Sequence, residues 1–179
     1  MYRKYFNIFI VLMIGLVFSI GSCSAGNSDE TESSSKSSKV NWVSYDEGLK
    51  LAAKENKVIF VDFYTTWCKF CVKMDKETFA RRDVADYMNE KIIAVKINAE
   101  SNTKIKLSNG EFSGRELAKS FGVKGFPTYW FLKSDGEKIN YFSGYRPADV
   151  FIDIVKYVGD GHYATKTMQE YTEEVHPSN

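Results

Sequence analysis

Two cysteines, Cys68 and Cys71, are the residues of this sequence whose spacing is best suited to covalent chemistry. They lie in the segment TTWCKFC (residues 65–71), where the first of them directly follows a tryptophan. The chain has 3 cysteines in all, and the third, Cys23, is distant, near the N-terminus. A pair with this spacing is open to three uses: as metal ligands, as a structural bridge or as a redox-active dithiol.

The supply of ligands argues against a metal at this pair. A closed zinc site needs four Cys, His or carboxylate ligands, but the chain has 2 histidines, His162 and His176, and both lie near the C-terminus. A covalent haem site needs a histidine directly after the second cysteine, where this sequence has Val72. The sequence therefore predicts no metal, and no cofactor beyond a redox-active disulfide.

The position of the pair favours redox chemistry over a structural bridge. A disulfide between residues so close in sequence restricts the unfolded chain little, so its entropic benefit is small. At a helix N-terminus, unpaired N–H groups and the helix dipole favour a thiolate on Cys68. Lys69 adds a positive charge, and Cys71, one turn along, faces the same side and can close the bridge. A purely structural disulfide remains an alternative interpretation, because disulfides persist in an oxidising compartment.

The elements around the pair predict an α/β fold. Continuous apolar strands between helical segments indicate a central mixed sheet with helices on both faces. The expected elements are, in order, a helix opened by an S-x-x-E capping box at Ser44, a buried strand (57–65), a helix after the cysteines, a helical patch (83–89), a second buried strand (91–98), a polar segment (99–113) with a turn at Asn109-Gly110, a helix opened by a capping box at Ser113, a hairpin about Asp135-Gly136, and a last helix from Pro147 to Gly159.

The N-terminal part predicts export and anchoring. Residues 1–22 have a basic start and an apolar run that is short for a membrane span, as in a signal peptide. The run closes on Ile-Gly-Ser-Cys23, which resembles a bacterial lipobox and implies lipid attachment at Cys23. An uncleaved anchor and ordinary cleavage after Ala25 are the alternatives. Residues 23–39 are rich in Ser and have no large apolar side chain, so they predict a flexible tether.

The rest of the chain predicts one domain over residues 40–159, a size usual for a single domain, followed by a loose polar tail over residues 160–179. Either anchored form leaves the domain outside the cytoplasm, in the periplasm, and Ser24 after the lipidated cysteine favours the outer membrane. The formal net charge is +1 and the chain has no dense Lys/Arg cluster, which gives no reason to expect nucleic acid as a partner.

The segment around the cysteines resembles the thioredoxin-like thiol–disulfide oxidoreductases over about residues 42–158. VDFYTTWCKFC is similar to the family's strand, tryptophan and C-x-x-C, and GVKGFPT (122–128) is similar to its helix end and cis-proline turn. Gly136 and Gly144 fall where the family has its late glycines. Within the family, the chain is similar to the periplasmic C-terminal domain of the DsbD disulfide reductases. The resemblance implies a thioredoxin fold.

The resemblance also implies catalytic roles. Cys68 matches the exposed attacking thiolate, and Cys71 matches the thiol that resolves the mixed disulfide. Asp62 matches the family's buried carboxylate; because burial raises the pKa of a carboxyl, Asp62 would hold or accept the proton that Cys71 must lose. Lys96 matches a family lysine that would tune this carboxylate. The alternatives are a strand-end polar residue for Asp62 and an exposed position for Lys96.

Substrate binding and redox tuning are implied in the same way. Pro127 matches the cis-proline that faces the disulfide; because proline has no N–H, the neighbouring backbone of Phe126 stays free to pair with an extended substrate segment. Trp67 would form an apolar wall beside the sulfurs, with an ordinary core position as the alternative. Lys69-Phe70 stands where thioredoxin itself has Gly-Pro. Because this dipeptide tunes the reduction potential, the resemblance does not fix the value of that potential or the direction of electron flow.

The predicted function is that of a membrane-tethered, extracytoplasmic reductase of protein disulfides. The implied partners are extracytoplasmic proteins with disulfides, such as those of cytochrome c maturation, and a membrane electron carrier of the DsbD or CcdA type as the reductant. A disulfide oxidase or isomerase with the same cysteines is one alternative. A peptide-binding module with a permanently bridged pair is another, which Asp62 disfavours because binding needs no proton relay.

Overall fold

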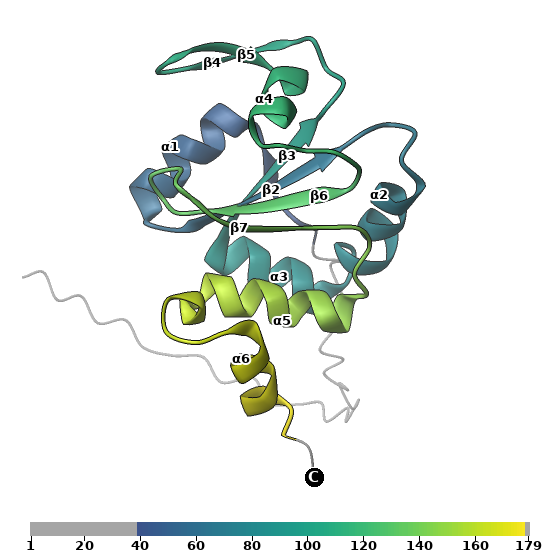
Figure 1. Cartoon of the computed structure of the whole chain (residues 1–179), viewed down its shortest axis with the longest axis vertical. Helices are drawn as coiled ribbons and strands as arrows, with labels where there is room; N and C mark the ends of the chain where they lie inside the picture. The colour runs from purple at the N-terminus through teal and green to yellow at the C-terminus, as the bar shows by residue number, and fades with distance from the viewer. Residues whose placement is uncertain (1–38, 178–179) are drawn as a thin grey trace, which may run out of the picture. The chain divides into compact units, whose positions relative to one another are not determined.

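The computed structural model describes residues 39–177. The predicted signal peptide, the lipidation site Cys23 and residues 24–38 of the predicted tether lie outside this range. Within the described range, no helix combines the length and apolar character that a membrane crossing requires. A five-stranded sheet with helices on both of its faces forms the centre of this part of the chain (Figure 1).

The sheet is mixed, as predicted. Its strand order is β1-β3-β2-β6-β7, with β1, β3 and β2 parallel to one another and β6 and β7 antiparallel to their neighbours. The strands are β1 (Trp42–Val43), β2 (Val58–Tyr64), β3 (Ile92–Asn98), β6 (Thr128–Leu132) and β7 (Lys138–Ser143). Because β2 is paired on both sides and covered on both faces, its β-branched and aromatic run is buried, as the continuous apolar pattern predicts.

The helices bury two separate hydrophobic clusters, one on each face of the sheet. They are α1 (Tyr45–Glu55), α2 (Lys69–Lys73), the π-helical turn η1 (Met74–Thr78), α3 (Arg82–Lys91), α4 (Gly114–Ser120), α5 (Ala148–Gly159), the 3₁₀ turn η2 (His162–Ala164) and α6 (Met168–Val175). Phe60 packs on one face with α3 and α5, whereas Phe63 packs on the other with α1 and α4. This alternation along β2 decides that Asp62 shares the face of Phe60.

Two predicted capping boxes have different outcomes. At α4 the prediction is confirmed, since Ser113 accepts from the backbone of Glu116 and the Glu116 side chain accepts from the backbone of Ser113. At α1 it is wrong: the Ser44 hydroxyl donates to Asp46 Oδ1 at 2.7 Å and makes no capping bond. Ser44 therefore bonds to the side chain of Asp46 instead of capping the helix backbone.

The polar segment 99–113 contains structure that the sequence analysis does not specify. It forms a two-stranded sheet of β4 (Lys104–Leu107) and β5 (Gly110–Ser113). Leu107 pairs with Gly110, so the two turn residues are Ser108 and Asn109, one position before the predicted Asn109-Gly110. Gly110 has a φ of 139°, which a residue with a side chain rarely adopts.

The C-terminal residues differ from the loose tail that the sequence predicts. Helix α6 begins with a capping box between Thr167 and Glu170. Its Tyr171 is buried, with the ring centroid 5.6 Å from that of Tyr157 on α5 and 5.0 Å from that of His162. A sequence signal for this helix was present, since Thr167-Met-Gln-Glu170 has the capping-box form and Met168, Tyr171 and Val175 recur at helical spacing.

Candidate active site

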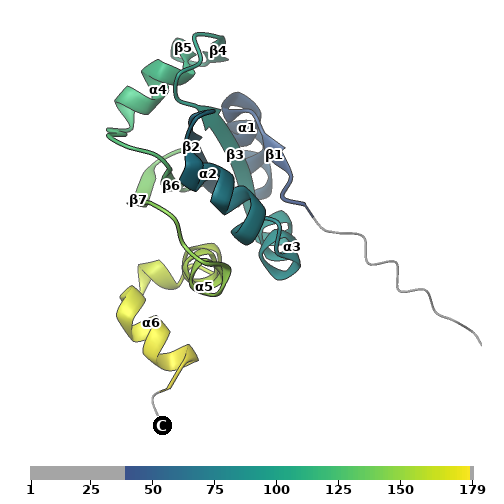
Figure 2. The same ribbon diagram turned by 90° about the vertical axis from the view of Figure 1, so that its right-hand side faces the viewer.

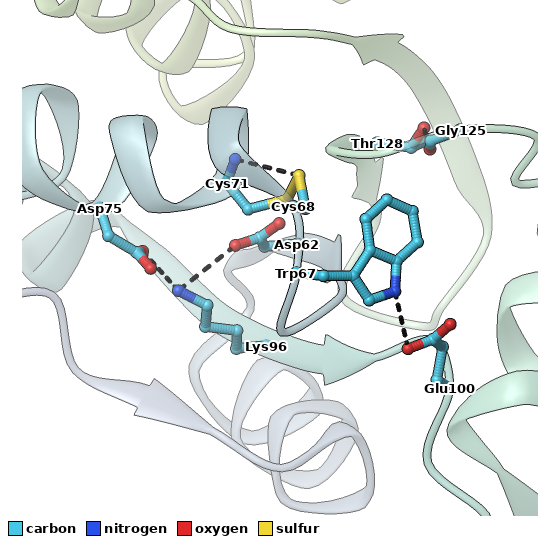
Figure 3. The surroundings of a disulfide bond; sticks show 9 residues. All are labelled: Asp62, Trp67, Cys68, Cys71, Asp75, Lys96, Glu100, Gly125 and Thr128. Atoms are coloured by element: carbon cyan, nitrogen blue, oxygen red, sulfur yellow. Dashed lines mark hydrogen bonds and ion pairs between the residues drawn. A yellow bond between two sulfur atoms is a disulfide. The ribbon is translucent and has the colours of Figure 1, made fainter.

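Cys68 and Cys71 form a disulfide at the start of the helix that follows β2 (Figure 3). Their Cα atoms are 5.3 Å apart, and Cys68 is the N-cap residue of α2. The backbone N–H of Cys71 donates to Cys68 Sγ at 3.1 Å. Because N–H groups at a helix start stabilise negative charge, this contact favours a thiolate on Cys68 when the disulfide is reduced.

Cys68 itself is less accessible than the sequence analysis expects. Its exposed fraction is 4%, equal to that of Cys71. Two large aromatic side chains near it are accessible: Trp67 is 65% exposed and Phe70 is 58% exposed. A client must therefore approach the sulfur past an aromatic surface.

Trp67 does not occupy an ordinary core position, which excludes the alternative reading of this residue. Its indole Nε1 donates to Glu100 Oε2 at 3.0 Å (Figure 3). Its ring also packs edge-on against Phe126, with the centroids 6.0 Å apart. The carboxylate of Glu100, in the loop after β3, thus holds the exposed indole in one orientation. Sequence reasoning missed Glu100, because nothing in the local pattern links it to a tryptophan so far away in the chain.

The turn before β6 completes this side of the site. The Phe126–Pro127 peptide bond is cis. The carbonyl of Pro127 accepts from the backbone N–H of Gly144 at 2.9 Å, and the hydroxyl of Thr128 donates to the carbonyl of Gly125 at 2.8 Å. These two bonds attach the turn to the end of β7 and to itself. Phe126, in this turn, is half-buried, and its ring lies against that of Trp67.

Asp62 is the titratable group buried beneath the pair. It is 1% exposed, and Figure 3 shows its carboxyl group between the disulfide and Lys96. Burial raises the pKa of Asp62 to about 7; the Lys96 ammonium, 3.6 Å from Oδ2, opposes this rise, and the negative charge of Asp75 adds to it. A carboxyl with a pKa near neutrality can both hold and release a proton at physiological pH.

Lys96 connects Asp62 to a second carboxylate. Its Nζ donates to Asp75 as well as pairing with Asp62, and it lies over the rings of Trp42 and Tyr64 at 5.0 Å and 5.2 Å. The exposed position considered for Lys96 is therefore wrong, since its side chain is 19% exposed. The sequence analysis missed Asp75. The available signal was its spacing, because Asp75 follows Cys71 by four residues and therefore lies on the same helical face.

Tyr129 is a second buried polar residue that sequence reasoning missed. It pairs with Asp62 across β2 and β6 and is fully buried. Among the described residues, neither Asp62 Oδ1 nor the Tyr129 hydroxyl has a hydrogen-bond partner. Burial, followed by the charge of Asp62, raises the pKa of Tyr129, so this phenol stays protonated. A carboxylate oxygen without a donor is one more reason why Asp62 favours its protonated form.

The structure brings together most of the residues that the sequence selects. Lys69 and Phe70, chosen for redox tuning, are on the first turn of α2 and face solvent. Cys23 lies outside the described residues. Within residues 39–177, no group of three or more His, Cys, Asp or Glu side chains is arranged to hold a metal ion. The groups that the site brings together are two sulfurs and a carboxyl that can hold a proton.

Comparison with known proteins places the site in a family. A family model described as a thioredoxin-like domain matches residues 45–159. The protein disulfide-isomerase of Datisca glomerata is 29% identical over 102 residues, which are 57% of this chain and 18% of that protein. The thiol:disulfide interchange protein DsbD of Actinobacillus pleuropneumoniae is 26% identical over 106 residues, 58% of this chain and 17% of that protein. The chain thus spans less than a fifth of the length of these two relatives.

Solved structures agree with this placement. A candidate disulphide-isomerase from Bacteroides thetaiotaomicron is 30% identical, with a TM-score of 0.57, and the match covers 74% of this chain and 99% of that one. A thioredoxin-fold protein from Helicobacter pylori is 25% identical, with a TM-score of 0.56, over 68% of this chain and 81% of that one. The predicted thioredoxin fold is confirmed. With its family match over residues 45–159 and its Cys68–Cys71 disulfide, the chain belongs to the thioredoxin-like family of thiol–disulfide oxidoreductases.

Proposed function

We propose that this protein is a membrane-tethered, extracytoplasmic reductase of protein disulfides. The observation that carries the proposal is the buried Asp62, whose pKa is raised to about 7 and which lies on the strand leading to Cys68 and Cys71. A bridge with only a structural role has no use for a carboxyl held at this pKa. The relatives named as disulfide isomerases and as DsbD support thiol–disulfide exchange as the reaction.

The first step is attack by Cys68. In the dithiol form its thiolate attacks one sulfur of the client disulfide; that S–S bond breaks, a mixed disulfide forms between Cys68 and the client, and the other client sulfur leaves as a thiolate that takes up a proton. The N–H of Cys71 that donates to Cys68 Sγ stabilises the attacking charge.

The second step releases the client. Cys71 loses its proton to Asp62 and attacks Cys68 Sγ, so that the Cys68–Cys71 disulfide forms and the second client sulfur leaves as a thiolate. The client has gained two electrons, and the protein is left with the disulfide seen in the structure. A further turnover needs two electrons from a donor, for which we propose a membrane electron carrier of the DsbD or CcdA type.

Client binding uses the aromatic surface around Cys68. Trp67 and Phe126 form one wall, and Phe70 is exposed beside the pair. The backbone of Phe126, next to Pro127, pairs with an extended segment of the client, because an extended peptide can add main-chain hydrogen bonds to a free backbone edge. Client disulfides with apolar neighbours fit this surface better than those within charged segments, since aromatic rings gain most from contact with apolar groups.

The proposed location follows from the N-terminal sequence. A signal peptide over residues 1–22 and lipid on Cys23 place the domain outside the cytoplasm, on a membrane, and Ser24 favours the outer membrane. Mass spectrometry of the mature protein tests this directly. Lipid on an N-terminal Cys23 is expected, whereas an unmodified N-terminus at Gly26 would contradict the tether.

The redox state in living cells tests the direction of electron flow. We expect that acid quenching of growing cells, followed by alkylation of free thiols, finds Cys68 and Cys71 mostly reduced, because a reductase must be kept as a dithiol by its donor. Deleting the membrane electron carrier should shift the pair to the disulfide. A pair that is fully oxidised in wild-type cells would contradict the reductase and favour an oxidase.

A disulfide isomerase is the second candidate, favoured by the relative named as a protein disulfide-isomerase. An isomerase also rests as a dithiol, so the two functions differ in the electrons consumed. A reductase oxidises one equivalent of its own dithiol for each client disulfide reduced. An isomerase restores a protein with scrambled disulfides without net oxidation of Cys68 and Cys71. Measuring both quantities in one refolding reaction separates them.

A further inference from the structure

The C-terminal segment beyond the family match folds back onto the domain. The match ends at residue 159, and η2 and α6 follow it. The Tyr157 hydroxyl donates to the carbonyl of Lys166 at 2.7 Å, and Tyr171 is buried against Tyr157. Figures 1 and 2 both show α6 beside α5. The segment is therefore a packed addition to the domain.

This addition leaves a cavity open between itself, α5 and the β6–β7 hairpin. The cavity has a volume of about 320 Å³, near the lower end of the range of small-molecule sites. Its walls are apolar: Ile139 and Phe142 come from β7, Ile154 from α5, and Tyr163 and Met168 from the added segment. Tyr163 and Met168 lie beyond residue 159, where the family match ends, so the cavity is a feature of the added segment and not of the matched domain alone.

Arg146 supplies the charge of this cavity. It is the charged residue among those that line it; its guanidinium lies 5.4 Å from the centre of the Phe142 ring, and its Nη1 donates to the carbonyl of Tyr145 at 2.9 Å. The arginines that form ion pairs within residues 39–177 are Arg81 and Arg82, so Arg146 has no carboxylate partner there.

A half-buried guanidinium without a counter-charge next to an apolar cavity is suited to an anion with an apolar body. Arginine presents its N–H groups as a planar fork that binds a carboxylate with two parallel hydrogen bonds. Aromatic walls favour a flat or branched apolar group, and a methionine side chain adapts to its shape. The size of the cavity excludes a folded domain as the occupant.

The geometry points to a binding site for a small organic carboxylate with an aromatic or branched apolar body. The apolar body occupies the space between Phe142, Ile154 and Met168, and the carboxylate pairs with Arg146. None of these residues belongs to the cysteine pair or is its proton-holding carboxyl, so the site is distinct from the one that carries out thiol–disulfide exchange.

Titration of the full-length protein with 4-phenylbutyrate tests the site. We expect saturable binding by calorimetry, with about tenfold or greater weakening when the probe is the neutral 4-phenylbutanamide, which keeps the ring but loses the charge. Acetate, which keeps the charge but loses the ring, should be weaker by a similar factor. Arg146→Gln should weaken 4-phenylbutyrate about tenfold or more, whereas the matched control Arg82→Gln, at an exposed arginine on α3, should leave binding unchanged.

A cavity-filling variant keeps the test informative if Arg146→Gln is unstable. Met168→Trp should abolish binding while disulfide reduction and the thermal midpoint stay near those of the wild type. Equal affinity for the acid and the amide, no saturable binding of 4-phenylbutyrate, or unchanged binding in Met168→Trp would each overturn the proposal. A concentration-dependent dimer that Met168→Trp abolishes would assign the cavity to a second copy of the chain and would overturn it as well.

Discussion

Two lysine–carboxylate pairs of this protein carry the same charges, yet their carboxyl groups have opposite pKa shifts. Asp62, on β2, is 1% exposed, and its Oδ2 is 3.6 Å from Lys96 Nζ. Glu116, in the first turn of α4, is half-exposed and accepts from Lys104 Nζ at 2.6 Å. Burial raises the pKa of Asp62 to about 7. Hydrogen bonds from Lys104 and Ser113 lower the pKa of Glu116 to about 2.

The comparison teaches that burial of the carboxyl group, more than the charge of its lysine partner, decides whether its pKa rises or falls. Removing a carboxylate from water penalises its charged form, and a single lysine does not offset that penalty for Asp62. At the surface, water continues to solvate Glu116, so the hydrogen bonds to its charged form decide. The buried pair can therefore hold a proton near neutral pH, whereas the surface pair serves as a helix cap.

The largest effect is expected at Cys71, the sulfur whose proton Asp62 is proposed to accept. Cys71→Ser keeps the attack by Cys68 but removes the resolving thiol, so turnover of a protein disulfide should be abolished and mixed disulfides with the client should accumulate. Non-reducing electrophoresis measures the adduct. Cys68→Ser is the matched control, in which both turnover and adduct should be absent. An adduct in Cys68→Ser would reverse the two roles.

Replacing the buried carboxyl should give the next largest effect. Asp62→Asn keeps the shape of the side chain but cannot accept a proton, so release of the client from the mixed disulfide should slow roughly 100-fold, while its formation changes little. Quenched-flow kinetics with a labelled client resolve the two steps. Glu116→Gln, the same change in the surface pair, should leave both rates unchanged. An unchanged release rate in Asp62→Asn would leave Asp62 a structural role only.

The pH dependence of stability should have opposite signs for the two pairs. The folded-state pKa of Asp62, about 7, lies above its unfolded value near 4, so the native state binds more protons between these pH values. The free energy of unfolding due to Asp62 should therefore fall as pH rises from about 4 to 7, by on the order of 1–4 kcal/mol. Asp62→Asn should remove this slope and stabilise the protein above pH 7.

For Glu116 the folded-state pKa is lowered, so its contribution to stability should be present above pH 4 and lost as pH falls through about 2. Glu116→Gln should remove that acid-side loss only. Urea unfolding of both variants across this pH range measures the two slopes. If Asp62 and Glu116 changed the free energy of unfolding with pH in the same direction, burial would not be what distinguishes the two lysine–carboxylate pairs.

Removing only the lysine should give the smallest effect. Lys96→Met keeps an apolar stem beneath Trp42 but removes the ammonium that opposes the rise, so the pKa of Asp62 should increase further. The pH at which client release reaches half its maximal rate should move upward, with release several-fold slower at pH 7 as an order-of-magnitude expectation. Lys104→Met should leave this profile unchanged. A shift toward acid pH would contradict the arrangement.

Much of the site could be predicted because its parts are local. The C-x-x-C spacing brings two sulfurs to one face of a helix turn, and a buried strand directly before it sets their position. The one charged residue in an otherwise apolar strand segment identifies Asp62. Glu100 and Tyr129 escaped prediction because each acts through a partner on another element, and the local sequence pattern carries no information about such pairings. Asp75 had a local signal, its place one helical turn after Cys71, but its ion pair with Lys96 on β3 did not.

The sequence by itself determined the α/β order, the cysteine pair at a strand-to-helix junction, the capping box at Ser113 and, to within one residue, the turn before Gly110, since each depends on residues within a few positions of one another. Only the tertiary structure decided that Trp67 is exposed, that the C-terminal residues form a packed helix, and that Lys96 connects two carboxylates. The physical reason is desolvation: the pKa of Asp62 depends on how much water its distant neighbours exclude, and that is a property of the folded packing.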